Sequence, residues 1–147
     1  MNAAAAQEAP SADELRLAPR DRFVNFVRDT LRTTQVSTSV LILALLYIRR
    51  LKLLHPRLRG QDGSEYRLCV TALMLGNKFL DDHTYTNKTW SDISGIPLKD
   101  VTKMEIEFWL GLQMRIHVTK AEYEEWQQAL EDLYEQRRQA LAKRARD

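Results

Sequence analysis

The stretch from residue 65 to residue 80 is apolar around almost its whole circumference when it is drawn as a helix at 100° per residue. The apolar members are Tyr66, Leu68, Cys69, Val70, Ala72, Leu73, Leu75, Gly76, Phe79 and Leu80. Only Arg67, Thr71 and Lys78 form a narrow polar stripe. Such a pattern is typical of a central helix packed by neighbours on nearly all sides. We therefore expect a core built around this helix, with Lys78 reaching the surface through the one gap.

The remaining segments also show helical periodicity, and no alternating run of useful length suggests a strand. The pattern predicts helices over 21–34, 38–54, 90–94, 98–113 and 119–141. Asp21 and Ser37 are suitable N-caps, and Thr119 with Glu122 forms a capping-box pattern. The Ala-rich stretch 1–19 has no apolar core like that of a secretory signal, so we expect a disordered leader. The fold class is therefore all-α.

Composition excludes several kinds of protein. Lys and Arg number 22 against 20 Asp and Glu, and this balance argues against non-specific nucleic-acid binding. The longest apolar run, 40–48, is far shorter than the roughly 20 residues that a membrane-spanning helix needs. A single cysteine, Cys69, excludes an intramolecular disulfide and a Cys-rich zinc site, and its apolar context indicates a small buried hydrophobe. We expect a soluble intracellular protein without membrane contact.

Glu105 is a misplaced charge in the predicted helix 98–113. It falls in the middle of an apolar arc whose members are Leu98, Val101, Phe108, Trp109 and Leu112. A carboxylate there costs free energy unless it is paired or hydrogen-bonded. One interpretation is an internal ion pair with Lys78 that holds two helices in register. The other places both groups at the rim of a groove, where they bind the backbone of a partner protein. The two interpretations are compatible.

Five segments, in order, resemble the cyclin box. Residues 69–82, CVTALMLGNKFLDD, resemble its third helix, and 103–110, KMEIEFWL, resemble its fifth. Residues 26–31 and 39–51 fit helices one and two, and 83–96, HTYTNKTWSDISGI, resemble the loop of fungal phosphate-regulon (P-type) cyclins. The resemblance implies a single five-helix cyclin box over 20–118, with an additional C-terminal helix and basic tail over 119–147. Asn77 departs mildly from a pattern in which many cyclins have a small residue such as Ser.

The resemblance also implies a function. Cyclins are non-catalytic regulatory subunits that bind and activate a cyclin-dependent serine/threonine kinase as a heterodimer, with no cofactor or metal. The family's kinase-binding lysine and glutamate correspond to Lys78 and Glu105. Asp81 and Asp82 are candidates for contacts with basic residues of the kinase, or else a solvated helix end. Tyr85 and Trp90 are candidate aromatic contacts, or else pack the short helix onto the next one.

The resemblance leaves the setting of this activity open. It is consistent with phosphate, nutrient or cell-cycle control in the nucleus and cytoplasm. The basic residues near the C-terminus, Arg137, Arg138, Lys143, Arg144 and Arg146, are a candidate nuclear-import patch.

Two other functions can be weighed on the residues. The three histidines lie in separate loops or helix edges, and no nucleophile motif or metal-ligand spacing is present, so an enzyme is not expected. A helix-turn-helix DNA-binding regulator is the alternative, because 90–94, the turn 95–97 and the helix from Leu98 have the required spacing. The acidic Glu105 and Glu107 of that recognition helix would face phosphates, which is unfavourable, and no nucleic-acid partner is expected.

Overall fold

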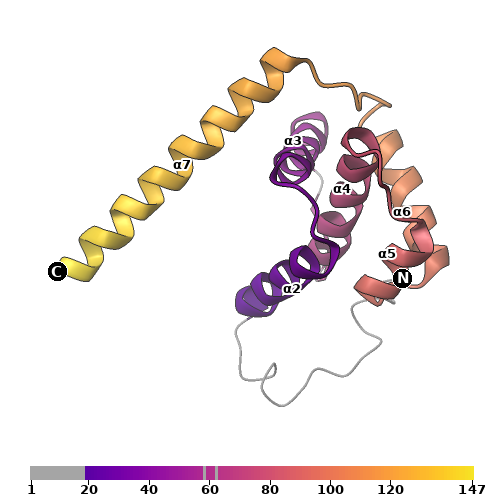
Figure 1. The fold of residues 1–147 in the computed structure, drawn as a ribbon, viewed down its shortest axis with the longest axis horizontal. Helices are drawn as coiled ribbons and strands as arrows, with labels where there is room; N and C mark the ends of the chain where they lie inside the picture. The colour runs from indigo at the N-terminus through magenta and orange to yellow at the C-terminus, as the bar shows by residue number, and fades with distance from the viewer. Residues whose placement is uncertain (1–18, 58, 62) are drawn as a thin grey trace. The chain divides into compact units, whose positions relative to one another are not determined.

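The computed structural model describes residues 19–57, 59–61 and 63–147, and these residues form six α-helices and no strand (Figure 1). The helices are α2 (Pro19–Thr34), α3 (Thr38–Leu54), α4 (Ser64–Leu80), α5 (Asn87–Ser94), α6 (Leu98–Gly111) and α7 (Lys120–Arg146). The all-α prediction is therefore confirmed for the described part of the chain. The predicted disordered leader lies outside the described residues except for Pro19. The chain divides into two compact units, Met1–Ile116 and His117–Asp147.

Helix α4 is the centre of the first unit. It contacts α2, α3, α5 and α6, and Figure 1 shows it between α3 and α6. Every residue from Val70 to Asn77 is buried, which is more than two full turns without a solvent-facing side. The predicted central helix is thus confirmed. The polar stripe was predicted in part wrongly, because Thr71 is buried and satisfies its hydroxyl by donating to the Arg67 carbonyl at 2.7 Å.

Helices α3 and α4 lie close together at Gly76. A Cβ atom added there would lie 3.0 Å from the Val40 carbonyl oxygen and 3.6 Å from the Ala44 nitrogen. Val40 and Ala44 are themselves buried, so neither can move aside into solvent. The absence of a side chain at Gly76 is therefore what permits this helix crossing.

The ends of the helices follow the expected capping chemistry with some shifts. The Ser37 hydroxyl accepts the Val40 N–H, and the Thr119–Glu122 capping box is present, as predicted. Helix α2 begins at Pro19, so Asp21 lies in its first turn and is not its N-cap, which corrects the prediction. Proline suits a first helical position because the amide there has no helical partner. Helix α5 begins at Asn87 and not at residue 90, because the Thr86 hydroxyl caps it by accepting the Thr89 N–H.

The buried face of α6 differs from the predicted arc. Val101, Met104, Phe108 and Leu112 are buried, whereas Leu98 and Trp109 are exposed by 45% and 37%. The actual stripe is rotated relative to the predicted one and includes Met104, which the wheel did not assign to it. Glu105 consequently lies at the edge of the buried stripe and not at its middle.

Substituting Gly76 by valine tests the helix crossing. We expect Gly76→Val to lower the free energy of unfolding by about 1–3 kcal/mol, because the new side chain overpacks the contact with Val40. The change runs against helix propensity, which favours valine over glycine. Urea denaturation followed by circular dichroism measures the effect. Thr102→Val, at an exposed position of α6, is the control. An unchanged urea midpoint for Gly76→Val would contradict the close crossing.

Cys69 provides a second test of the fold. Burial raises the pKa of its thiol to about 11, and the side chain is only partly accessible. Because the thiolate is the reactive form, we expect iodoacetamide at pH 8 to alkylate native Cys69 about a hundredfold more slowly than the urea-unfolded chain. Mass spectrometry of the time course measures both rates. Equal rates would mean that the α4 surface around Cys69 is open to solvent.

Candidate functional site

Lys78 and Glu105 form an ion pair between α4 and α6. The Lys78 Nζ and Glu105 Oε2 atoms are 2.5 Å apart, and the two side chains are 37% and 19% exposed. Lys78 lies in the last turn of α4, directly after the buried stretch that ends at Asn77. The predicted internal ion pair is therefore confirmed, and it lies at the surface rather than within the core.

Asn87, the first residue of α5, completes a three-residue polar cluster. Its Oδ1 accepts from Lys78 Nζ at 2.8 Å, and its Nδ2 donates to Glu105 Oε1 at 3.1 Å. The cluster thus joins three helices. Lys78 and Glu105 each form a hydrogen bond with Asn87 in addition to their ion pair. The sequence analysis missed Asn87. The Thr86-x-x-Thr89 capping pattern would have placed Asn87 at the start of a helix. Nothing in the sequence around Asn87 indicates that it bonds Lys78 and Glu105, which are distant from it in the chain.

A second charged pair joins the same two helices. Arg67 Nη2 and Asp100 Oδ2 are 3.7 Å apart, and both side chains are about one-fifth exposed. Arg67 and Lys78 are the two cations of the predicted polar stripe of α4, and each faces an acid of α6. Two charged pairs therefore connect α4 and α6.

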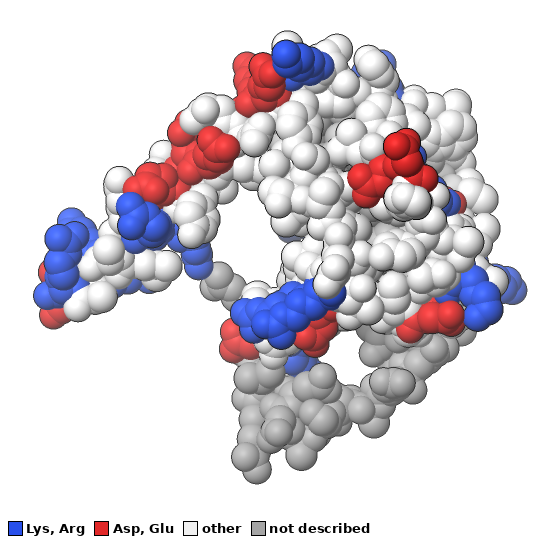
Figure 2. Space-filling model, viewed as in Figure 1, with Lys and Arg blue, Asp and Glu red and all other residues white. Residues whose placement is uncertain are grey.

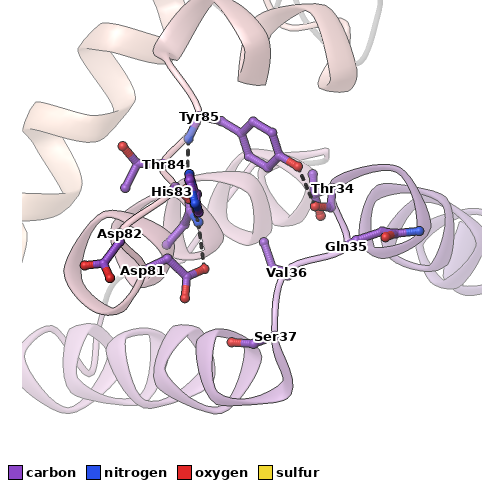
Figure 3. Close-up of a pocket in the computed structure, with 10 residues that line it drawn as sticks. Thr34, Gln35, Val36, Ser37, Asp81, Asp82, His83, Thr84 and Tyr85 are labelled. Carbon is purple, nitrogen blue, oxygen red and sulfur yellow. Dashed lines mark hydrogen bonds between the residues drawn. The ribbon is translucent and has the colours of Figure 1, made fainter.

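Asn77 organises the chain that follows α4. This side chain is buried, its Nδ2 donates to Asp81 Oδ2 at 3.0 Å, and its Oδ1 accepts the Tyr85 N–H at 3.2 Å. The Tyr85 hydroxyl in turn donates to the Thr34 carbonyl at 2.8 Å (Figure 3). Asn77 is therefore a structural anchor for residues 81–85, a role that an amide fulfils because it both donates and accepts.

A pocket of about 730 Å³ opens between this loop and the connection from α2 to α3 (Figure 3). Its lining comprises Thr34, Gln35, Val36, Ser37, Asn77, Asp81, Asp82, His83, Thr84 and Tyr85. Asp81 is partly buried and Asp82 is exposed. The two predicted acidic site residues therefore both line this pocket, and they offer carboxylate oxygens to a basic group.

Trp90 is fully buried, so it cannot contact a partner directly, and that interpretation was wrong. Its ring packs edge-on against Tyr85, with 5.9 Å between the ring centroids. Large aromatic side chains are stabilised in this way inside a core. Both aromatic residues serve chiefly to hold the loop and α5 in place.

The helix-turn-helix arrangement exists, but its chemistry does not suit DNA. Helices α5 and α6 are joined by residues 95–97, as the spacing predicted. The exposed Lys103 is paired with Glu107 on the same helix, at 3.8 Å. In Figure 2, the basic groups of the first unit lie next to acidic ones, whereas basic groups gather toward the C-terminal end of α7. No observation here favours nucleic-acid binding.

Two kinds of feature are absent from residues 19–57, 59–61 and 63–147. No group of three or more His, Cys, Asp or Glu side chains is placed there to hold a metal ion. No helix there has the length and apolar character to cross a membrane.

Comparison with known proteins finds several cyclins. Cyclin-U2-2 of Arabidopsis thaliana is 28% identical over 95 residues, covering 65% of this chain and 41% of the relative. Cyclin-P4-1 of Oryza sativa subsp. japonica is 28% identical over 92 residues, covering 63% and 43%. G1/S-specific cyclin pas1 of Schizosaccharomyces pombe is 30% identical over 109 residues, covering 69% and 25%. The chain thus spans less than half the length of these relatives, and no solved structure shows a significant match.

The family profile described as Cyclin matches residues 15–116, which is well over half of the chain. The match includes all of the site described above, with Lys78, Asn87 and Glu105. The resemblance to the P-type cyclins agrees with the name of the rice relative, Cyclin-P4-1. The chain therefore belongs to the cyclin family.

Proposed function

We propose that the chain is a non-catalytic regulatory subunit that binds and activates a cyclin-dependent serine/threonine kinase as a heterodimer. The observation that carries the proposal is the partly exposed cluster of Lys78, Asn87 and Glu105. It presents a cation and an anion, already oriented, at the point where the central helix leaves the core. The cyclin family membership supports the same role.

The polar cluster has hydrogen-bonding capacity left for a partner. Lys has three N–H donors, and described residues use two of them, through Glu105 and Asn87. A carboxylate has about four acceptor positions, so Glu105 also retains some. Carbonyl and N–H groups at a helix end lack partners within their own helix, and Lys78 and Glu105 together suit both kinds. A kinase whose regulatory helix must be positioned for catalysis offers such a target.

Exposed apolar side chains flank the cluster. Phe79 and Leu80 follow Lys78 directly, and Trp109 lies one turn after Glu105 on the same side of α6. Stable interfaces combine an apolar centre with a few polar anchors, and aromatic residues are enriched among their strongest contacts. This surface, the α4–α6 face, is defined here by Lys78, Phe79, Leu80, Glu105 and Trp109.

Asp81 and Asp82 extend the α4–α6 face with negative charge. We propose that they attract basic residues of the kinase, with Asp82 exposed and Asp81 held by Asn77. Charges at the rim of an interface act mainly on the rate of association. We further propose that the complex works in the nucleus and cytoplasm in phosphate, nutrient or cell-cycle control, and that the basic end of α7 assists nuclear import.

Exchanging the two charges separates kinase binding from the internal ion pair. We expect Lys78→Glu and Glu105→Lys each to lower affinity for the kinase at least about thirtyfold, because each leaves a partner group unpaired. The double variant restores the internal pair, so it should regain wild-type stability but not kinase binding. Calorimetric titration with each purified cyclin-dependent kinase of the source organism measures affinity. A peptide phosphorylation assay measures kinase activation, and thermal unfolding measures stability.

The control for this exchange is Lys103→Glu combined with Glu107→Lys, because this exposed pair on α6 lies away from the cluster. It should leave kinase binding and activation unchanged. Normal binding by both single variants, or recovery of binding in the double variant of Lys78 and Glu105, would contradict the proposed contact.

Reversing the charge of Asp82 tests the acidic extension. Because Asp82 is exposed and helix-flanking, Asp82→Lys should leave the fold intact and slow association with the kinase, while dissociation changes little. The effect should shrink as salt rises, since screening weakens interactions between exposed charges. Surface plasmon resonance at several salt concentrations resolves the two rates. A change confined to dissociation, or no change at low salt, would remove Asp82 from the interface.

A further inference from the structure

Asn87 is the neutral member of the polar cluster, and it bonds both of its charged neighbours at once. Its Oδ1 accepts from Lys78 Nζ at 2.8 Å, while its Nδ2 donates to Glu105 Oε1 at 3.1 Å. The ion pair uses the other carboxylate oxygen, Oε2, at 2.5 Å from Nζ. The three side chains therefore form a closed triangle of contacts, and each contact joins a different pair among α4, α5 and α6.

An amide suits the third corner of this triangle because it has one end of each kind. Its carbonyl oxygen accepts and its amino group donates, so a single side chain satisfies a cation on one side and an anion on the other. Aspartate has the same shape, but it would place a second carboxylate against Glu105. Alanine would lose both bonds. The chemistry of Asn87 therefore matches the opposite charges of Lys78 and Glu105.

The local structure of α5 holds the backbone of Asn87 in place. Thr86 caps the helix directly before it, and the Thr86 hydroxyl accepts the Thr89 N–H. Trp90, three residues further on, is fully buried and packs edge-on against Tyr85. Helix α5 also contacts α2, α4 and α6. The short Asn87 side chain therefore starts from a fixed point, from which it can hold two longer and more flexible side chains.

Helix formation alone does not account for an asparagine at this position. Thr86 already provides the cap, and Asn87 occupies the first helical position after it. A carboxylate there would interact favourably with the positive end of the helix dipole, and alanine has the higher helix propensity. Aspartate or alanine would therefore suit the start of α5 better, whereas the triangle requires an amide.

We propose that Asn87 is a positioning residue for kinase binding, a role that rests on the proposed function of the cluster. Lysine and glutamate have many rotamers, and the entropy lost when a partner fixes them subtracts from affinity. Two of the three Lys78 N–H groups point at Asn87 and Glu105, so the tetrahedral ammonium determines the direction of the third. Asn87 thus gives Lys78 one donor of defined direction before the kinase arrives.

Substituting Asn87 separates positioning from helix stability. We expect Asn87→Ala to lower kinase affinity about tenfold in calorimetric titration, because two side chains lose their order before binding. The urea midpoint should change little, since the better helix former offsets two partly exposed hydrogen bonds. Asn87→Asp should lower affinity at least as much, although it suits the helix start. Asn25→Ala on α2, which removes an amide that accepts from Arg28 at 3.3 Å, is the control and should bind normally.

A double-mutant cycle shows whether Asn87 acts through its charged neighbours. In a Lys78→Met background, Asn87→Ala should change affinity less than about threefold, because the ammonium that it orients is gone. In the free chain, ¹⁵N relaxation of the Lys78 ammonium should show greater motion after Asn87→Ala. A role confined to the folding of α5 would move neither of these quantities.

Normal binding by Asn87→Ala or by Asn87→Asp would overturn the positioning role. An equal loss in the wild-type and Lys78→Met backgrounds, or an unchanged mobility of the Lys78 ammonium, would overturn it as well. Loss of binding by Lys78→Glu together with normal binding by Asn87→Ala contradicts this inference alone. Normal binding by Lys78→Glu contradicts the proposed function, on which the inference rests.

Discussion

The burial of α4 is the constraint on which the rest of the first unit depends. A helix whose residues 70–77 are all buried must be covered on every side, and α2, α3, α5 and α6 provide that cover. The close crossing at Gly76 brings α3 near enough to exclude solvent. After Asn77 the helix leaves the core, and Lys78, Phe79 and Leu80 in its last turn are exposed. The candidate site therefore lies on a rigid element, and its orientation is determined by the core.

The ion pair of Lys78 and Glu105 contributes more to orientation than to stability. Because the lysine is more than one-third exposed, solvent screens the attraction, and such pairs contribute little to the free energy of folding. Asn87 nevertheless holds both groups in one geometry. Side chains that are ordered before binding lose less conformational entropy when a partner arrives. A polar cluster of this kind suits recognition better than it suits core packing.

Much of the fold could be predicted from the sequence, because the apolar pattern of residues 65–80 leaves few alternatives to a central helix. The wheel also showed that Glu105 needs a partner, and it placed Lys78 in the polar stripe of the central helix, where it could be that partner. It could not show the true buried stripe of α6, because the exposure of Leu98 and Trp109 depends on where neighbouring helices end. Asn77 and Asn87 were missed because an amide acquires its partners only through tertiary structure. The burial of Trp90, which packs against Tyr85, likewise depends on tertiary structure that its place in the sequence does not show.

Helix α7 differs from α4, since none of its residues is fully buried. Its capping box, its acidic start and its basic end all stabilise a helix locally. Such local terms are small, and most helical stability in proteins comes from packing an apolar face. Leu133, Tyr134 and Leu141 are exposed, so they stabilise α7 only through helix propensity and contacts between residues three or four apart in the same helix.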